Sequence, residues 1–177
     1  MRQLLLLRHA KSSWEDRDLA DHARPLSPRG RAAAAGMRQA MDTLGLLPDL
    51  VLVSSALRTR QTAEALEPWP ETPLLEPMDS LYLATAPQML KILRGVAETV
   101  RSVLVVGHNP GLHQLAMLLV GAHAMTYANP DLRRLAEGYP SGALAEFTLA
   151  GPWRALDEGG GRLVRFLCPR DLPGLGG

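Results

Sequence analysis

Three short runs of apolar residues recur along the chain, and each is followed by polar residues and then by a segment with helical spacing. The runs are Leu4–Leu7, Leu50–Val53 and Val103–Val106. Runs of this length are typical of strands that are buried on both faces. Strands that alternate with helices place those helices on both faces of a mostly parallel sheet. The sequence therefore predicts an α/β fold, a three-layer α/β/α sandwich.

Helical spacing of apolar residues, together with capping residues, predicts four helices. They cover about residues 28–44, 56–66, 85–100 and 110–119. The first begins where Ser27 can cap the helix and Pro28 fits its first turn, and Gly45 ends it. Thr85 and Pro87 begin the third helix in the same way.

The remaining segments are less regular. Residues 67–77 contain four of the fourteen prolines, so we expect an irregular segment with at most a short strand. Residues 143–149 and 162–167 are predicted to be a final strand pair, joined by a turn at 159–161, which would add antiparallel edge strands to the sheet. The tail after about residue 170 is rich in proline and glycine and is expected to be flexible.

Length and composition restrict the class of protein. The 177 residues, of which 46% are hydrophobic, suit one domain that spans residues 1–177. The formal net charge of +1 gives no general attraction to nucleic acid or to membranes, and no apolar run approaches a membrane span. The first apolar run is too short for a signal peptide, and the single cysteine, Cys168, excludes an internal disulfide, so we expect a cytoplasmic protein. Nothing in the pattern indicates the oligomeric state.

Polar side chains follow each of the three apolar runs. Arg8 and His9 follow the first, Ser54 follows the second with Arg58 on the next helical turn, and His108 and Asn109 follow the third. The carboxyl ends of parallel strands meet at one edge of a sheet, so these side chains are expected to share a pocket. Two arginines, two histidines and helix N-terminal amides suit a dianionic phosphoryl group.

The motifs that carry these residues, taken in order, resemble those of the histidine phosphatase superfamily, which includes the phosphoglycerate mutases. They are Leu-Leu-Arg-His-Ala at 6–10, Ser-Ser-Ala-Leu-Arg-Thr-Arg-Gln-Thr-Ala at 54–63 and Val-Val-Gly-His-Asn-Pro at 105–110. The small size and the segments 10–14, 24–30, 81–82 and 139–143 resemble the SixA-type phosphohistidine phosphatase branch. The resemblance covers about residues 3–170 and implies a phosphoglycerate mutase-like fold. Ala10 stands where glycine is common in the superfamily, and alanine fits this branch.

The resemblance also implies roles for the pocket residues. His9 is expected to attack phosphorus as a neutral imidazole and to form a phosphohistidine intermediate, which water then hydrolyses. Arg8 and Arg58 would clamp the phosphoryl oxygens, and a protonated His108 would donate to the same oxygens. The neighbouring arginines should discourage protonation of His9. No metal or other cofactor is expected, because the arginines supply the positive charge.

The group that protonates the leaving group is the least defined part of the site. Larger members of the superfamily use a glutamate after the Arg58-bearing helix and the next strand, where this chain offers Glu76 and Asp79. Asp79 lies nearer the expected place and is our candidate proton donor. A phosphoramidate nitrogen is already basic, and such a leaving group would reduce the need for a carboxylic acid.

Other polar residues have two open interpretations. Lys11 and Ser12 either contact phosphate or are merely close to His9 in the sequence. For Ser54 and Asn109 the alternative to phosphate contact is a structural role, at the end of a strand or as a helix cap. Asp21 and Arg24 either pair to shape a loop over the pocket or form a solvated pair. We expect His22, His113 and His123 to serve surface or core packing. Arg133 and Arg134 are expected in a solvated loop. Cys168 is expected in a buried apolar environment.

The function predicted from these observations is that of a metal-independent phosphatase acting on phosphohistidine in a phosphorylated protein. A small-molecule phosphomonoesterase or mutase, acting on a small phosphate ester, is the alternative enzyme, although no long insertion is present to build a closed pocket. A non-catalytic phosphate-binding adaptor is the alternative from another class. The presence of His9 argues against the adaptor, because binding alone needs only the cations.

Overall fold

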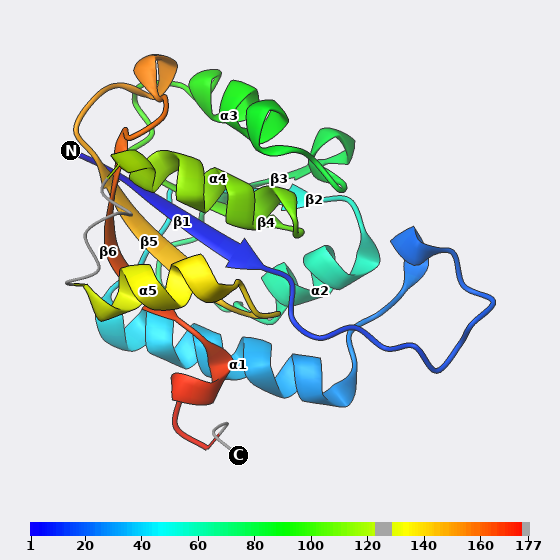
Figure 1. Cartoon of the computed structure of the whole chain (residues 1–177). Helices are drawn as coiled ribbons and strands as arrows, with labels where there is room; N and C mark the ends of the chain where they lie inside the picture. The colour runs from blue at the N-terminus through cyan, green and yellow to red at the C-terminus, as the bar shows by residue number, and fades with distance from the viewer. Residues whose placement is uncertain (123–128, 175–177) are drawn as a thin grey trace.

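The structure, a computed structural model, describes residues 1–122 and 129–174 and centres on a six-stranded sheet (Figure 1). The strands are β1 (Arg2–Arg8), β2 (Leu50–Ser54), β3 (Leu74–Met78), β4 (Ser102–Gly107), β5 (Leu144–Leu149) and β6 (Gly161–Leu167). Their order across the sheet is β3-β2-β4-β1-β5-β6. The first four of these are parallel to one another, β5 is antiparallel to β1, and β6, at the edge of the sheet, is antiparallel to β5. The mixed sheet predicted from the sequence is confirmed.

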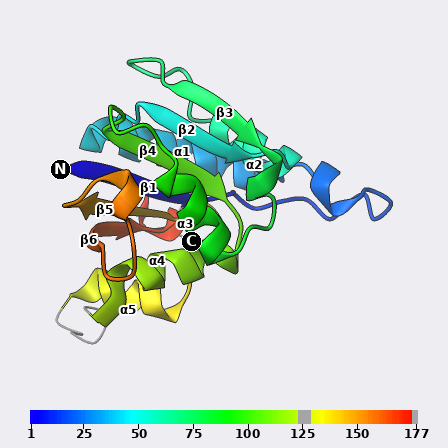
Figure 2. The same cartoon turned by 90° about the horizontal axis from the view of Figure 1, so that it is seen from above.

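Helices cover both faces of the sheet, as Figures 1 and 2 show. They are α1 (Pro28–Leu44), α2 (Leu57–Glu64), α3 (Ala86–Arg94), α4 (Gly111–Val120) and α5 (Pro130–Glu137). Leu5 and Leu7 pack in one hydrophobic cluster with Met37 of α1, whereas Leu4 and Leu6 pack in another with Leu112 of α4. Successive side chains of β1 therefore enter opposite layers, which explains why the strand is apolar at every position.

Both predicted boundaries of α1 and the predicted start of α3 are confirmed. The Ser27 hydroxyl accepts a hydrogen bond from the Gly30 amide at 3.0 Å, and Gly45 ends α1 in the left-handed conformation, with φ of 66°. Thr85 and Gln88 form a reciprocal capping box at the start of α3. These local signals need no tertiary partner, which is why they are readable from the sequence.

Two predictions about these segments are wrong and a third is incomplete. Helix α3 ends at Arg94 rather than near residue 100, because the Gly95 amide closes the last turn onto Ile92. A turn does precede β6 at the glycines, where the Gly160 amide donates to the Asp157 carbonyl, but the connection from β5 is longer and also contains a 3₁₀ turn (Trp153–Ala155) whose Trp153 is fully buried. The segment at 133–134 lies on α5, whose N-cap is Asn129; the Asn129 side chain accepts a hydrogen bond from the Asp131 amide.

The tail also differs from expectation within the described residues. Pro169–Asp171 form a 3₁₀ turn, and Leu172 is buried in the cluster that contains Met37. An ion pair between Asp171 and Arg134 of α5 holds the turn in place. Tertiary burial thus overrides the proline and glycine content of the tail as far as Leu172. No helix among the described residues is long and apolar enough to cross a membrane.

Candidate active site

A pocket of about 340 Å³ lies beside the carboxyl ends of β1 and β4. The strand register explains this position, because Arg8 pairs with Gly107, which places His9 and His108 on adjacent chain segments. Most of the residues singled out in the sequence line the pocket: Arg8, His9, Lys11, Ser12, Arg58, His108 and Asn109. A larger groove of about 730 Å³ between β3 and α3 is lined by no histidine or arginine, and we do not assign the chemistry there.

His9 is buried, and within the described residues one of its two ring nitrogens makes a hydrogen bond while the other makes none. Its Nδ1 lies 2.7 Å from the Ala10 carbonyl oxygen, which can only accept, so Nδ1 carries the proton and Nε2 keeps its lone pair. The His9 amide donates to Gly107 O at 3.1 Å, and the Gly142 amide donates to His9 O at 3.0 Å. Gly142 has φ of 78°, a conformation that glycine adopts without strain. The backbone of His9 is thus fixed from both sides, and its tautomer suits a nucleophilic Nε2.

The environment of His9 keeps it unprotonated at neutral pH. Burial, the largest influence, lowers the pKa of His9 to about 4; the Ala10 hydrogen bond opposes this, and the charges of Arg58, Arg8 and Arg24 add to it. The arginines therefore lower the pKa of His9 as expected, but burial lowers it more.

His108 differs from the expectation, because its protein surroundings do not favour its protonated form. Burial, then the neighbouring His9 and Arg58, lower the pKa of His108 to about 3. Its Nδ1 lies 3.4 Å from Arg58 Nη2, which can only donate, and its Nε2 lies 2.7 Å from Ser54 Oγ. The neutral ring therefore accepts from Arg58 and donates to Ser54. Ser54 positions His108 from behind and does not line the pocket.

Arg58 is held by the loop that precedes α1. Its guanidinium donates to the Asp21 backbone oxygen at 2.7 Å and to Asp21 Oδ2 at 3.0 Å. The hydroxyl of Tyr82 donates to the same carboxylate oxygen, and Arg24 Nη1 donates to Oδ1 at 3.1 Å. The Tyr82 hydrogen bond above all, with those from Arg58 and Arg24, lowers the pKa of Asp21 to about 2. Asp21 thus joins two arginines and one tyrosine at the edge of the pocket.

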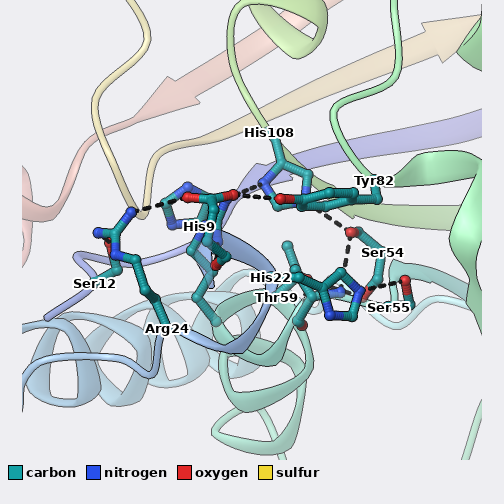
Figure 3. Close-up of polar contacts among 12 residues, drawn as sticks. His9, Ser12, His22, Arg24, Ser54, Ser55, Thr59, Tyr82 and His108 are labelled. Carbon is teal, nitrogen blue, oxygen red and sulfur yellow. Dashed lines mark hydrogen bonds and ion pairs between the residues drawn. The ribbon is translucent and has the colours of Figure 1, made fainter. Parts of the chain in front are cut away.

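Arg24 is a third arginine of the pocket, which the sequence analysis did not assign to phosphate. It is only 6% exposed, and it donates to the Ser13 carbonyl at 3.2 Å and to Ser12 Oγ (Figure 3). Of the two interpretations of the Asp21–Arg24 pair, the structure supports the loop-shaping one. The sequence signal for this role of Arg24 was the segment 24–30, which runs into the capped start of α1. Its place beside His9 depends on tertiary contacts, which the sequence does not show.

The carbonyl oxygen of Tyr139 orients two pocket residues. It accepts hydrogen bonds from Arg8 Nη1 and from Asn109 Nδ2, each at 2.9 Å. Arg8 Nε is buried and makes no hydrogen bond within the described part of the chain. Arg8 therefore has a donor to offer an oxyanion, whereas the amide nitrogen of Asn109 holds the segment that follows β4.

Asp79 does not reach the pocket. It is exposed at the start of a 3₁₀ turn (Asp79–Leu81), and its backbone carbonyl accepts from the Tyr82 amide. Glu76 lines the separate groove beside α3. Among the described residues that line the pocket there is no aspartate or glutamate. The expectation of Asp79 as proton donor has no geometric support.

The remaining histidines have structural partners or lie outside the described residues. His22 Nε2 lies 2.9 Å from Ser55 Oγ, and its ring packs edge-on against Tyr82. His113 Nε2 lies 2.6 Å from the Leu135 carbonyl, and His123 falls in the segment 123–128 that is not described. Cys168 is buried, as expected. The described residues contain no group of three or more histidine, cysteine, aspartate or glutamate side chains suited to a metal ion.

Comparison with known proteins gives consistent similarities. Residues 4–79 match the model of the histidine phosphatase superfamily (branch 1). An uncharacterized Mycobacterium tuberculosis protein, Rv1276c, is 34% identical over 171 residues, covering 93% of this chain and 100% of that protein. An uncharacterized chloroplastic protein of Arabidopsis thaliana is 36% identical over 131 residues; the match covers 68% of this chain but only 60% of that protein.

A solved structure agrees over nearly the whole chain. The protein assigned as phosphohistidine phosphatase SixA from Nakamurella multipartita superposes with a TM-score of 0.82 at 28% identity, covering 95% of this chain and 96% of that one.

Proposed function

Because the chain belongs to the histidine phosphatase superfamily, in its SixA-type branch, and is therefore a phosphatase, we propose that its substrate is phosphohistidine in a protein. The observation that carries the proposal is that no described residue offers the pocket a carboxylic acid: no carboxylate lines it, and the Asp21 carboxylate at its edge is held ionised by Arg58, Arg24 and Tyr82, with its pKa lowered to about 2. An alkyl phosphate ester needs an acid to protonate its departing oxygen. A phosphorylated imidazole has a second ring nitrogen that solvent can protonate before the P–N bond breaks.

In the first proposed step, His9 Nε2 attacks phosphorus while the P–N bond of the substrate breaks. The substrate imidazole, already protonated by solvent on its second ring nitrogen, departs as a neutral imidazole with the electron pair of that bond. Arg8, Arg24 and Arg58 stabilise the charge on the three phosphoryl oxygens. Arg58 uses two of its five N–H groups on Asp21 and a third on His108 Nδ1, which leaves two for the substrate.

In the second proposed step, water attacks the phosphorus of phosphorylated His9. The bond to Nε2 breaks, inorganic phosphate forms and the neutral imidazole is restored. The dianionic phosphoryl group also favours protonation of His108, which burial and the neighbouring Arg58 oppose. We propose that no metal ion takes part, because the three guanidinium groups supply the positive charge. The single cysteine still favours the cytoplasm as the compartment.

The test compares substrates under one set of conditions. A phosphohistidine protein and a panel of sugar phosphates are incubated with the enzyme, with and without EDTA, and released phosphate is measured. We expect a clear preference for the phosphohistidine protein and no effect of EDTA. A preference for sugar phosphates would overturn the proposed substrate, and loss of activity with EDTA that magnesium restores would overturn the metal-free mechanism.

A further inference from the structure

Two large apolar side chains that are exposed to solvent line the pocket. Trp14 is 70% exposed and Leu83 is 53% exposed, and both contribute to the wall of the pocket that contains His9. Together they give the polar pocket an apolar rim that a ligand can contact. Neither residue has a role in the chemistry described above.

The backbone of Leu83 is strained. Its φ is 50°, and among the described residues it alone combines a side chain with a positive φ. A leucine in this region is disfavoured by contact between its Cβ atom and the backbone. Strain of this kind, kept at an exposed position on the rim of a pocket, indicates a functional constraint rather than a packing one.

Trp14 is held in place by Arg24. The guanidinium carbon of Arg24 lies 3.1 Å from the centroid of the indole ring, a cation–π stack. Arg24 is itself fixed by Asp21 and Ser12. The exposed indole therefore has a defined position beside the pocket, and one of its faces covers a phosphate-binding arginine.

The two apolar groups approach the pocket from different sides. Trp14 stacks on Arg24, which binds Asp21 Oδ1, whereas Leu83 follows Tyr82, whose hydroxyl binds Oδ2. Figure 3 shows Arg24 and Tyr82 on either side of the drawn cluster, with the ring of His9 between them. The buried His9 receives the phosphoryl group, so the group attached to phosphorus extends outward between these two sides.

Given the proposed function, on which this inference rests, we propose that Trp14 and Leu83 determine specificity by contacting the leaving group. The chemical class that fits is a flat, unsaturated ring bonded to phosphorus through nitrogen, because a ring can lie against an indole and an isobutyl group. The proposal predicts discrimination against phosphoramidates that lack a ring.

The experiment compares two substrates that differ only in the leaving group. N-phosphoimidazole has a ring, and phosphoramidate releases ammonia. Trp14→Ala and Leu83→Ala are each expected to lower kcat/KM for N-phosphoimidazole about tenfold more than kcat/KM for phosphoramidate, the size of an aromatic contact. Trp14→Phe should retain most of the activity. Leu19→Ala is the matched control, since Leu19 is exposed on the same loop and does not line the pocket.

Each outcome decides one question. Equal losses on both substrates would show that Trp14 acts only through Arg24 and would overturn the inference, as would no loss on either. The wild-type enzyme tests the proposed function separately. If it hydrolyses neither nitrogen-linked compound but does hydrolyse sugar phosphates, the proposed function fails before the variants are compared.

Discussion

The pocket is built from two regions that are held in place in different ways. Arg8 ends β1, His9 follows it and His108 follows β4, and the parallel ladder between these strands fixes their backbone. Asp21 and Arg24 lie on the loop between β1 and α1, which is held by side-chain hydrogen bonds and one isolated bridge between Ser12 and Leu26. The strand ends present the proposed nucleophile, and the loop adds charge around it. The two regions should therefore respond differently to substitution and to pH.

The largest effect is expected at the strand ends, for His9→Ala. Removal of this imidazole should lower kcat by at least about a thousandfold, because the other histidine that lines the pocket, His108, has both ring nitrogens bonded to Arg58 and Ser54. Steady-state turnover of a phosphohistidine protein measures it. The control is His113→Ala, whose histidine bonds to a backbone carbonyl away from the pocket. Residual activity within tenfold of wild type would reject His9 as the nucleophile.

Arg58 connects the two regions and should have the next largest effect. Arg58→Ala should lower kcat/KM by roughly a hundredfold, because a buried donor to the phosphoryl oxygens is lost. Arg58→Lys should recover only part of this, since an ammonium group lacks the planar fork. Arg60→Ala is a matched control on the same helix, where the side chain is exposed. Full rescue by lysine would mean that charge alone matters.

The pH profile separates the regions without a substitution. The pKa of His9 is lowered to about 4, so kcat/KM should fall about tenfold per pH unit only below that value, as Nε2 takes up a proton. The Asp21 contacts should persist there, because the pKa of Asp21 is lowered to about 2. Initial rates are measured from pH 3 to 8 and corrected for substrate ionisation and spontaneous hydrolysis. A decline centred near 6.5, the ordinary pKa of histidine, would contradict the buried environment.

The smallest effect is expected in the loop, for Asp21→Asn. The carboxylate is partly exposed, and such ion pairs contribute about 0.2–1 kcal/mol, so kcat/KM should fall only severalfold. Asp18→Asn on the same loop is the control, because the Asp18 side chain makes no ion pair among the described residues. The comparison of the two regions fails if Asp21→Asn is as damaging as Arg58→Ala.

The difference between the regions also explains what the sequence could predict. The strand ends were predictable because a buried apolar run and the residue after it are neighbours in the chain. The caps at Ser27 and Thr85 were predictable for the same reason. Helix α5 was missed although Asn129 and Pro130 form a capping signal, because its eight residues bury only Leu135.

The contacts of the loop between β1 and α1 could not be predicted from residues that are neighbours in the sequence. Asp21 meets Tyr82 across 61 positions of sequence, and only the folded chain brings them together. The choice of Asp79 as proton donor has no support from the pocket lining for the same reason, since its distance from Arg58 in the sequence says nothing about its exposed position. The neutral state of His108 depends on burial and on neighbouring charges, which the sequence pattern does not contain.

The most direct test of the mechanism is to identify the phosphorylated residue. The enzyme is mixed briefly with a ³²P-labelled phosphohistidine protein, quenched in base, separated from substrate and digested. The account predicts base-stable, acid-labile label on the peptide that contains His9, and no label on the His9→Ala variant. Label on His108 or on any other residue, or turnover with no labelled enzyme at any quench time, would contradict it.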